Sequence, residues 1–291
     1  MSGEERWQLS GNAAAFYDRY VMLIMEPWVR RLVDVAMLQP DEHVLDVACG
    51  TGFVARLAAQ RVGVKGRVVG IDLNPGMIEA ARKTDAPTTI DWRIGDAAAL
   101  AFEGGRFDAV LCQQGLQFFP DRIQALREMR RVLRLGGRLA LTVWSAVADT
   151  PYAAALAAAL TRHVSPEAGS MAQAPHALHD AADLQGLVAS AGFRNVQVRP
   201  TIATTKLPLP EEFVPGHLAA LPIAQAIAQL PHDRRARPHQ RHERSAPRLC
   251  RRQAVDGTGR GSCRHGECLT PRSTGPSARV ARTRQVSVGV R

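Results

Sequence analysis

The stretch HVLDVACGTGFVARLA, residues 43–58, places a carboxylate and a glycine-rich bend between an apolar run and an amphipathic run. Gly50 and Gly52 permit a tight turn and the close approach of a ligand, because neither carries a Cβ atom. A turn of this kind before a helix N-terminus is where parallel sheets bind nucleotide-like ligands. Every α/β protein also needs turns between strand and helix, so the two glycines are weak support when taken alone.

Two cofactors compete for this turn. Gly50, Gly52 and Ala55 match the pattern G-x-G-x-x-A, and Asp72 follows Gly52 by 20 residues, as in dinucleotide-binding proteins. Asp46 argues against that interpretation, because a pyrophosphate gains nothing from a carboxylate beside its binding turn. The cationic amino and sulfonium groups of S-adenosylmethionine would instead be attracted to it. The charge pattern therefore favours S-adenosylmethionine over a nicotinamide dinucleotide.

Polar residues also close the three apolar runs that follow. Asp72 ends the first and is suited to accept hydrogen bonds from two ribose hydroxyls, and Asp96 is placed to accept from an adenine amine. Gln113 and Gln114 end the third, where the reacting end of the cofactor would lie. Since ligands of parallel sheets bind at the carboxyl ends of the strands, we expect these groups to line one crevice.

Short apolar runs alternate with amphipathic segments of about ten residues, which predicts a parallel sheet covered by helices on both faces. The fold class expected is α/β, a Rossmann-like three-layer sandwich with a mostly parallel sheet. Strands are predicted at 43–48, 67–72, 90–95, 107–113 and 137–144, and helices at 12–37, 53–62, 74–83 and 121–133. Beyond them we expect a helix starting at Thr150, a polar loop at 164–178, a helix at 180–191, a strand at 195–205 and a helical stretch at 210–229.

Four motifs occur in order: VLDVACGTG, GIDLNPGMIEAAR, GDAAALAF followed by FDAVLCQQGLQFFPD, and REMRRVLRLGGRLAL. Together they resemble the successive motifs of class I S-adenosylmethionine-dependent methyltransferases. The likeness is greatest to the branch that contains the ubiquinone/menaquinone-biosynthesis C-methyltransferases, and it covers roughly residues 10–205. The resemblance implies S-adenosyl-L-methionine as the cofactor and a small-molecule methyl acceptor as the partner.

By this resemblance, Asp46 and the turn that follows would hold the methionine part of the cofactor, and Asp72 the ribose. Leu73 would pack on the adenine, and Asp96 with Ala97 would read its amine. Ala48 stands where the family has its first motif glycine, and Phe16, Tyr17 and Tyr20 resemble the family's lid. The residues expected to bind the cofactor are Asp46, Ala48, Gly50, Thr51, Gly52, Asp72, Leu73, Asp96, Ala97 and Gln113.

The basic charge of the chain is concentrated in its last 62 residues. Residues 230–291 hold 15 Arg and no Lys against 4 acidic residues, whereas residues 1–229 have a net charge of −1. This tail also lacks Phe, Tyr, Trp, Ile and Met, so it is expected to be disordered. Its Lys-free, Arg- and Pro-rich bias is typical of a GC-rich gene translated out of frame. We therefore hypothesise that the native reading ends near Leu230.

The expected organisation has four parts. Residues 1–40 form a helical lid, 41–206 the cofactor-binding core, 207–229 a helical segment and 230–291 the Arg-rich tail. The family's sheet ends in an antiparallel hairpin, of which only the strand near 195–205 is evident. RQVSVGV at 284–290 alternates between polar and apolar residues like a strand. Because so many residues separate it from the strand near 195–205, we do not expect it to pair with that strand. The sequence thus predicts a sheet whose C-terminal hairpin is lacking or disordered.

The function expected is methyl transfer to a carbon or oxygen of a small apolar or aromatic acceptor. An alternative is an inactive remnant that holds the cofactor on a truncated fold. A third reading, a nucleic-acid methyltransferase using the basic tail, is disfavoured by the neutral body and the absence of an NPPY-like sequence. No catalytic residue is nominated among His163, His176 and His179, and Cys49 and Cys112 are interpreted as small buried residues.

No metal site is expected, since CRHGEC at 263–268 is only half of a zinc-binding pattern. The charged N-terminus does not resemble a signal peptide, and YVMLIMEPWV at 20–29 is too short and too interrupted to span a bilayer. These features predict a cytoplasmic protein without a membrane span.

Overall fold

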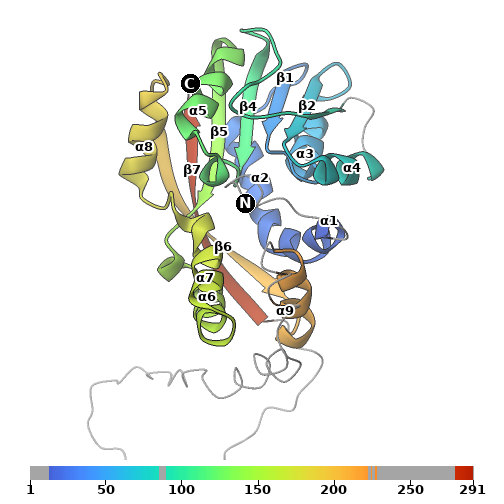
Figure 1. Cartoon of the computed structure of the whole chain (residues 1–291). Coiled ribbons are helices and arrows are strands. Elements are labelled where there is room, and N and C mark those ends of the chain that lie inside the picture. The colour runs from blue at the N-terminus through green and yellow to red at the C-terminus, as the bar shows by residue number, and fades with distance from the viewer. Residues whose placement is uncertain (1–12, 85–89, 222–223, 225–226, 228–278, 291) are drawn as a thin grey trace, which may run out of the picture.

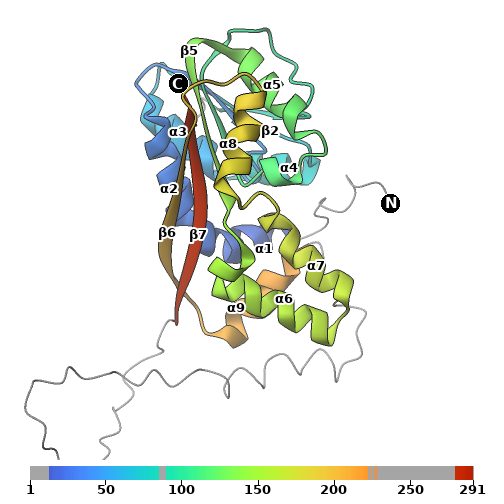
Figure 2. The same cartoon turned by 90° about the vertical axis from the view of Figure 1, so that its left-hand side faces the viewer.

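The computed structural model describes residues 13–84, 90–221, 224, 227 and 279–290. A single seven-stranded sheet runs through it in the order β3-β2-β1-β4-β5-β7-β6, with helices on both faces (Figures 1 and 2). Its strands are β1 (His43–Val47), β2 (Arg67–Asp72), β3 (Ile90–Ile94), β4 (Phe107–Gln113), β5 (Leu133–Trp144), β6 (Gln197–Leu207) and β7 (Arg279–Val290). The first five pair in parallel, which confirms the expected Rossmann-like α/β class.

Within the parallel part, β1, β2 and β4 each lead into a helix, whereas the segment between β3 and β4 contains no helix. The N-terminal segment is α1 (Ala13–Phe16), the π-helix η2 (Tyr17–Val21) and α2 (Met22–Ala36). The crossover helices are α3 (Phe53–Val62), α4 (Pro75–Lys83), η3 (Leu116–Phe118) and α5 (Arg122–Val132). After β5 come η4 (Val147–Asp149), α6 (Pro151–His163), α7 (Pro166–Gln173), η5 (Ala174–His176), α8 (Ala181–Ser190) and α9 (Pro210–Ala219).

Strand side chains alternate between two buried cores. Leu45 and Val47 of β1 pack with α5 and α8 on one face, whereas Val44 packs with α2 and α3 on the other. Because both faces are covered, the central strands are apolar nearly throughout, as the run FDAVLCQ illustrates. Local signals set the helix starts: Asn74 accepts a hydrogen bond from the Gly76 amide, and Asp121 accepts one from the Gln124 amide.

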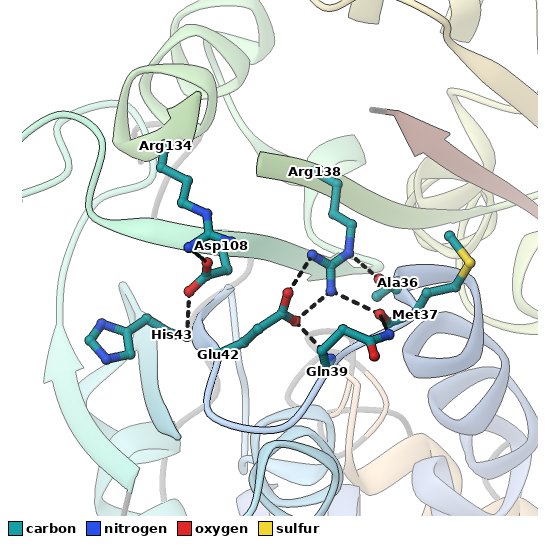
Figure 3. A network of polar contacts seen from close by, with 8 residues as sticks. All are labelled: Ala36, Met37, Gln39, Glu42, His43, Asp108, Arg134 and Arg138. Atoms are coloured by element: carbon teal, nitrogen blue, oxygen red, sulfur yellow. Dashed lines mark hydrogen bonds and ion pairs between the residues drawn. The ribbon is translucent and has the colours of Figure 1, made fainter. Parts of the chain in front are cut away.

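An ion-pair network fastens the amino-terminal edge of the sheet (Figure 3). Arg138 of β5 contacts both carboxylate oxygens of Glu42, at 2.8 and 2.5 Å, and also donates to the carbonyl oxygens of Ala36 and Met37 at the end of α2. Nearby, Arg134 pairs with Asp108, which also accepts a hydrogen bond from the backbone amide at the start of β1. The network joins α2, β1, β4 and β5 at the end opposite the glycine turn.

The C-terminal hairpin departs from the sequence prediction. β7 lies between β5 and β6 and is antiparallel to both, so β6 is paired along its whole length. The segment 284–290, which we did not expect to supply the partner, is therefore part of the sheet. The prediction overestimated the entropic cost of the long connection before β7, because the entropy of closing a loop grows only slowly with its length. Residues 230–278, for which a disordered tail is predicted, lie outside the described residues.

A second correction concerns residues 164–178, which were predicted to form a polar loop. They contain α7 and η5, because Ser165 accepts a hydrogen bond from the Ala168 amide and Pro166 occupies the first helical position. β5 also begins at Leu133 rather than at 137. Helices α6, α7 and α9 gather beyond the carboxyl end of β5, beside the N-terminal helices (Figures 1 and 2).

Candidate active site

The order of the strands reverses between β1 and β4, and the glycine turn lies at the carboxyl end of β1. Its backbone takes left-handed values at Ala48 (φ 57°), Gly50 (φ 54°) and Gly52 (φ 89°). A Cβ on Gly52 would lie 2.3 Å from the ring of Trp92, so this position admits only glycine. Ala48 holds a conformation that is unfavourable for a residue with a Cβ, whereas glycine adopts it freely.

Asp46 is fully buried in β1, and neither of its carboxylate oxygens has a hydrogen-bond partner among the described residues. Burial raises the pKa of Asp46 well above its usual value. The Ala55 backbone amide lies near the carboxyl group without reaching hydrogen-bond geometry and lowers this pKa in part. The Asp72 carboxylate raises it further, and the Arg56 guanidinium lowers it. A buried carboxylate left without a partner is destabilising, so this position is suited to a cationic or hydrogen-donating ligand.

Asp72 ties the end of β2 to the glycine turn. Its Oδ2 accepts a hydrogen bond from the Gly50 amide at 2.8 Å, and its Oδ1 accepts one from the Asn74 amide at 2.9 Å. Burial nevertheless raises the pKa of Asp72. Its neighbour Leu73 is exposed, although it is a large apolar side chain at the edge of the site. This exposed leucine is available to pack against a flat apolar group.

Asp96 and Ala97 follow β3, next to β2 in the sheet. Asp96 is exposed and its Oδ1 accepts a hydrogen bond from the Ala98 amide, whereas Ala97 is buried. Gln113 ends β4, and its buried side-chain nitrogen has no partner among the described residues. The four strand ends thus present their polar residues along one edge of the sheet, in the order Asp96, Asp72, Asp46 and Gln113.

The N-terminal helices reach this edge. The Asp72 carboxylate contributes to a raised pKa of Tyr17, about 12, although burial is the larger cause. Asp18 interacts with Thr51 of the glycine turn and with Arg56, while burial raises its own pKa. Both residues belong to η2, and π-helical turns are frequent at functional sites. Asp18 and Arg56 were not identified from the sequence, because a charged residue on a helix usually faces solvent.

A partly open cavity of about 200 Å³ lies beyond the ends of β4 and β5, lined by residues of η2, α2, η3, α6, α7, η5 and α9. No Asp, Glu, Lys or Arg is among the described residues that line it, and its walls are mainly aliphatic and aromatic. Two of the polar residues that face it, Tyr17 and Gln114, were expected near the cofactor. The other four were not predicted to be functional: Thr150, Tyr152, His176 and His217. They come from distant segments, so sequence spacing contained no signal that would group them.

Cys49 and Cys112 are buried and free. Burial raises the pKa of Cys112 to about 12 and that of Cys49 well above its usual value, so neither thiol ionises at neutral pH. Within the described ranges, no group of three or more His, Cys, Asp or Glu is arranged to hold a metal ion. In the same part of the chain, no helix is long and apolar enough to cross a membrane.

Comparison with known proteins identifies the domain. The family described as "Methyltransferase domain" matches residues 44–137, which include the glycine turn and all four polar strand ends. The match supports, for residues 44–137, a methyltransferase domain of the class I S-adenosylmethionine-dependent type, and S-adenosyl-L-methionine is the cofactor of that class. The unpartnered carboxylate of Asp46 fits a cofactor that bears an amino group and a sulfonium.

Individual relatives agree with this family. The aklanonic acid methyltransferase DauC of Streptomyces sp. strain C5 is 38% identical over 46% of this chain and 63% of its own length. The ubiquinone/menaquinone biosynthesis C-methyltransferase UbiE of Stenotrophomonas maltophilia is 38% identical over 45% of this chain and 53% of its own. The chain therefore spans between half and two thirds of these curated relatives.

A solved structure supports the fold. A Bacillus halodurans C-125 protein, assigned as a methyltransferase, superposes with a TM-score of 0.53 at 20% identity. The superposition covers 90% of this chain and 97% of the Bacillus protein. At this identity the likeness concerns the arrangement of helices and strands alone.

Proposed function

We propose that this protein transfers a methyl group from S-adenosylmethionine to a carbon or oxygen of a small apolar or aromatic acceptor. The observation that carries the proposal is the buried, unpartnered carboxylate of Asp46 near the carboxyl end of β1. An uncharged cavity, lined by Gln114 just beyond the end of the neighbouring strand β4, accompanies it. Relatives named for aklanonic acid and for ubiquinone/menaquinone biosynthesis support a small-molecule acceptor.

In the proposed complex, Asp46 and the turn of Ala48, Gly50, Thr51 and Gly52 hold the methionine part of the cofactor. Asp72, already oriented by two backbone amides, accepts from the ribose hydroxyls. Leu73 packs on the adenine, Asp96 and Ala97 bind its amine, and Gln113 lies at the reacting end. The site residues named here are Asp46, Ala48, Gly50, Thr51, Gly52, Asp72, Leu73, Asp96, Ala97 and Gln113.

The cofactor supplies an activated methyl group, so the task of the chain is alignment and the exclusion of water. The acceptor atom must lie within about 3–3.5 Å of the methyl carbon for in-line displacement. The cavity between the N-terminal helices and α6, α7 and α9 supports this role, because its walls are mainly apolar and carry no charged side chain among the described residues. We propose residues 1–40 as the lid. Tyr17, which belongs to this segment, lines the cavity and lies close enough to Asp72 for the Asp72 carboxylate to raise the pKa of Tyr17.

Titration calorimetry with S-adenosylmethionine and with NADH on the full chain tests the proposal. We expect saturable binding of S-adenosylmethionine, no competition by NADH, and loss of binding in Asp46→Asn. Asp91→Asn is the matched control, because Asp91 is an exposed carboxylate of β3 that pairs with Arg93. Displacement by NADH, or unchanged affinity in Asp46→Asn, would overturn the proposal. Tight binding without turnover on any acceptor would favour the inactive remnant instead.

A further inference from the structure

One histidine of the cavity is held in a single tautomer. His176 of η5 is buried, and its Nδ1 lies 2.5 Å from the backbone carbonyl oxygen of Ser145. A carbonyl oxygen only accepts hydrogen bonds, so Nδ1 carries the proton and Nε2 keeps a lone pair in the neutral ring. The ring packs against Trp144, another lining residue, with centroids 5.8 Å apart. The imidazole is thus oriented by a backbone group on one side and borders the cavity.

We propose that His176 is the general base of methyl transfer, taking the proton from a phenolic or enolic hydroxyl of the acceptor through Nε2. The inference rests on the proposed function and names its substrate class, an oxygenated aromatic or enolised compound. As the acceptor oxygen, or the ring carbon conjugated to it, forms its bond to the methyl carbon, the carbon–sulfur bond breaks. The hydroxyl proton passes to Nε2, leaving an imidazolium, a methylated acceptor and S-adenosylhomocysteine.

The surroundings keep His176 neutral before the reaction. Burial lowers its pKa, the Ser145 carbonyl raises it in part, and His179 lowers it. The other titratable groups that face the cavity are Tyr17 from η2, Tyr152 from α6 and His217 from α9. Burial raises the pKa values of both tyrosines and lowers that of His217 to about 4, so all three are neutral at pH 7. A neutral imidazole at pH 7 is the form that accepts a proton.

Three further polar atoms support an oxygenated acceptor. The hydroxyls of Thr150 and Tyr152 and the Nδ1 atom of His217 are buried and have no hydrogen-bond partner among the described residues. Thr150 stands at the N-cap position of α6, yet its side chain makes no capping bond. Because buried polar groups are normally hydrogen-bonded, these atoms are suited to bind the remaining oxygens of a ligand. A purely hydrocarbon ligand would leave all three unpaired.

A chromogenic phenol tests this assignment without turnover. The full chain, with S-adenosylhomocysteine present, is titrated with 4-nitrophenol at a pH one unit below the pKa of the free phenol. We expect the wild type to bind the probe and to raise the phenolate fraction of the bound form severalfold above that of the free probe. In His176→Asn the side-chain amide can still donate to the Ser145 carbonyl, but no base remains, so the increase should vanish.

His163→Ala is the matched control, since His163 ends α6 and does not line the cavity. Nitrogen NMR of the histidine rings supplies a second readout, in which we expect His176 to carry its proton on Nδ1. Three results would overturn the proposal: a proton on Nε2, an equal phenolate fraction in wild type and His176→Asn, or no binding of 4-nitrophenol. Failure of the proposed function would be seen separately, as a lack of S-adenosylhomocysteine binding.

Discussion

The backbone amide of Gly50 donates a hydrogen bond to Oδ2 of Asp72 at 2.8 Å, which joins the turn after β1 to the end of β2. The same carboxylate accepts from the Asn74 amide, so both oxygens of Asp72 are held in place before a ligand arrives. A rotamer fixed in this way loses less entropy when it binds a diol. The relationship explains how two motifs that are 22 residues apart form one binding surface.

Replacing Asp72 with asparagine is expected to weaken the binding of S-adenosylmethionine by about 1.5–3 kcal/mol, as for a hydrogen bond to a charged group. One of the two amide donors would then face an NH2 group, so the side chain would also lose its fixed orientation. Calorimetry measures the loss, with Asp91→Asn as the control. Equal affinities for Asp72→Asn and the wild type would show that Asp72 does not contact the cofactor.

Asp46→Asn is expected to stabilise the ligand-free protein by about 1–2 kcal/mol at pH values at which the wild-type carboxyl group is ionised, because it then removes a buried charge without a partner. The folded pKa of Asp46 is raised, so its contribution to stability is present at low pH and is lost as pH rises through that pKa. The variant should lack this pH dependence. Urea denaturation at a series of pH values measures both effects, and a difference in stability between variant and wild type that does not change with pH would contradict the argument.

Ala48→Gly is expected to raise the free energy of unfolding by about 0.5–1 kcal/mol, since φ at this position is 57°. The strain that is relieved exceeds the extra entropy that glycine adds to the unfolded chain. Ala55→Gly in α3 is the control, where the same change should destabilise by about 1 kcal/mol. Chemical denaturation compares the two variants, and the prediction fails if both lose stability.

Glu42→Gln is expected to destabilise the fold by about 2–3 kcal/mol at pH 7, because it leaves Arg138 facing a neutral group. Burial alone would raise the pKa of Glu42. The hydrogen bonds from Arg138 and from the Gln39 amide outweigh this effect, so the pKa of Glu42 lies below that of an ordinary glutamate. The pair therefore stabilises above the unfolded pKa, and its effect is lost as pH falls through the folded pKa.

The control for this change is Glu26→Gln, which breaks an exposed pair with Arg30 on α2. Exposed pairs contribute little, so a loss below about 0.5 kcal/mol is expected there. Thermal unfolding followed by circular dichroism measures both variants. Equal losses in the two would mean that the network in Figure 3 has no special role.

A chain ending at Leu230 lacks β7 and would leave β5 and β6 without their antiparallel partner. We expect a lower Tm and a tendency to aggregate through the exposed strand edges. Cofactor affinity should change less than stability, because the polar strand ends belong to β1, β2, β3 and β4. Size-exclusion chromatography and thermal unfolding measure the effect. An unchanged Tm would support the hypothesis that the native reading ends near Leu230.

Local patterns were sufficient for the parallel half of the sheet. The apolar runs, the caps at Asn74 and Asp121 and the family motifs predicted the first five strands and their helices, because such signals act over a few residues. They failed at β7, whose place depends on pairing across some 70 residues, and at α7, whose cap at Ser165 was overlooked. The cofactor roles of the individual site residues remain predictions.

By itself, the sequence determined the class of the domain, its cofactor and the residues at the strand ends, since a βα repeat brings every carboxyl end to one edge of the sheet. Only the tertiary structure revealed the uncharged cavity, because His176, His217 and Tyr152 come from separate helices and meet through packing. It also showed that Asp46 is buried without a partner, as burial depends on every layer of the fold.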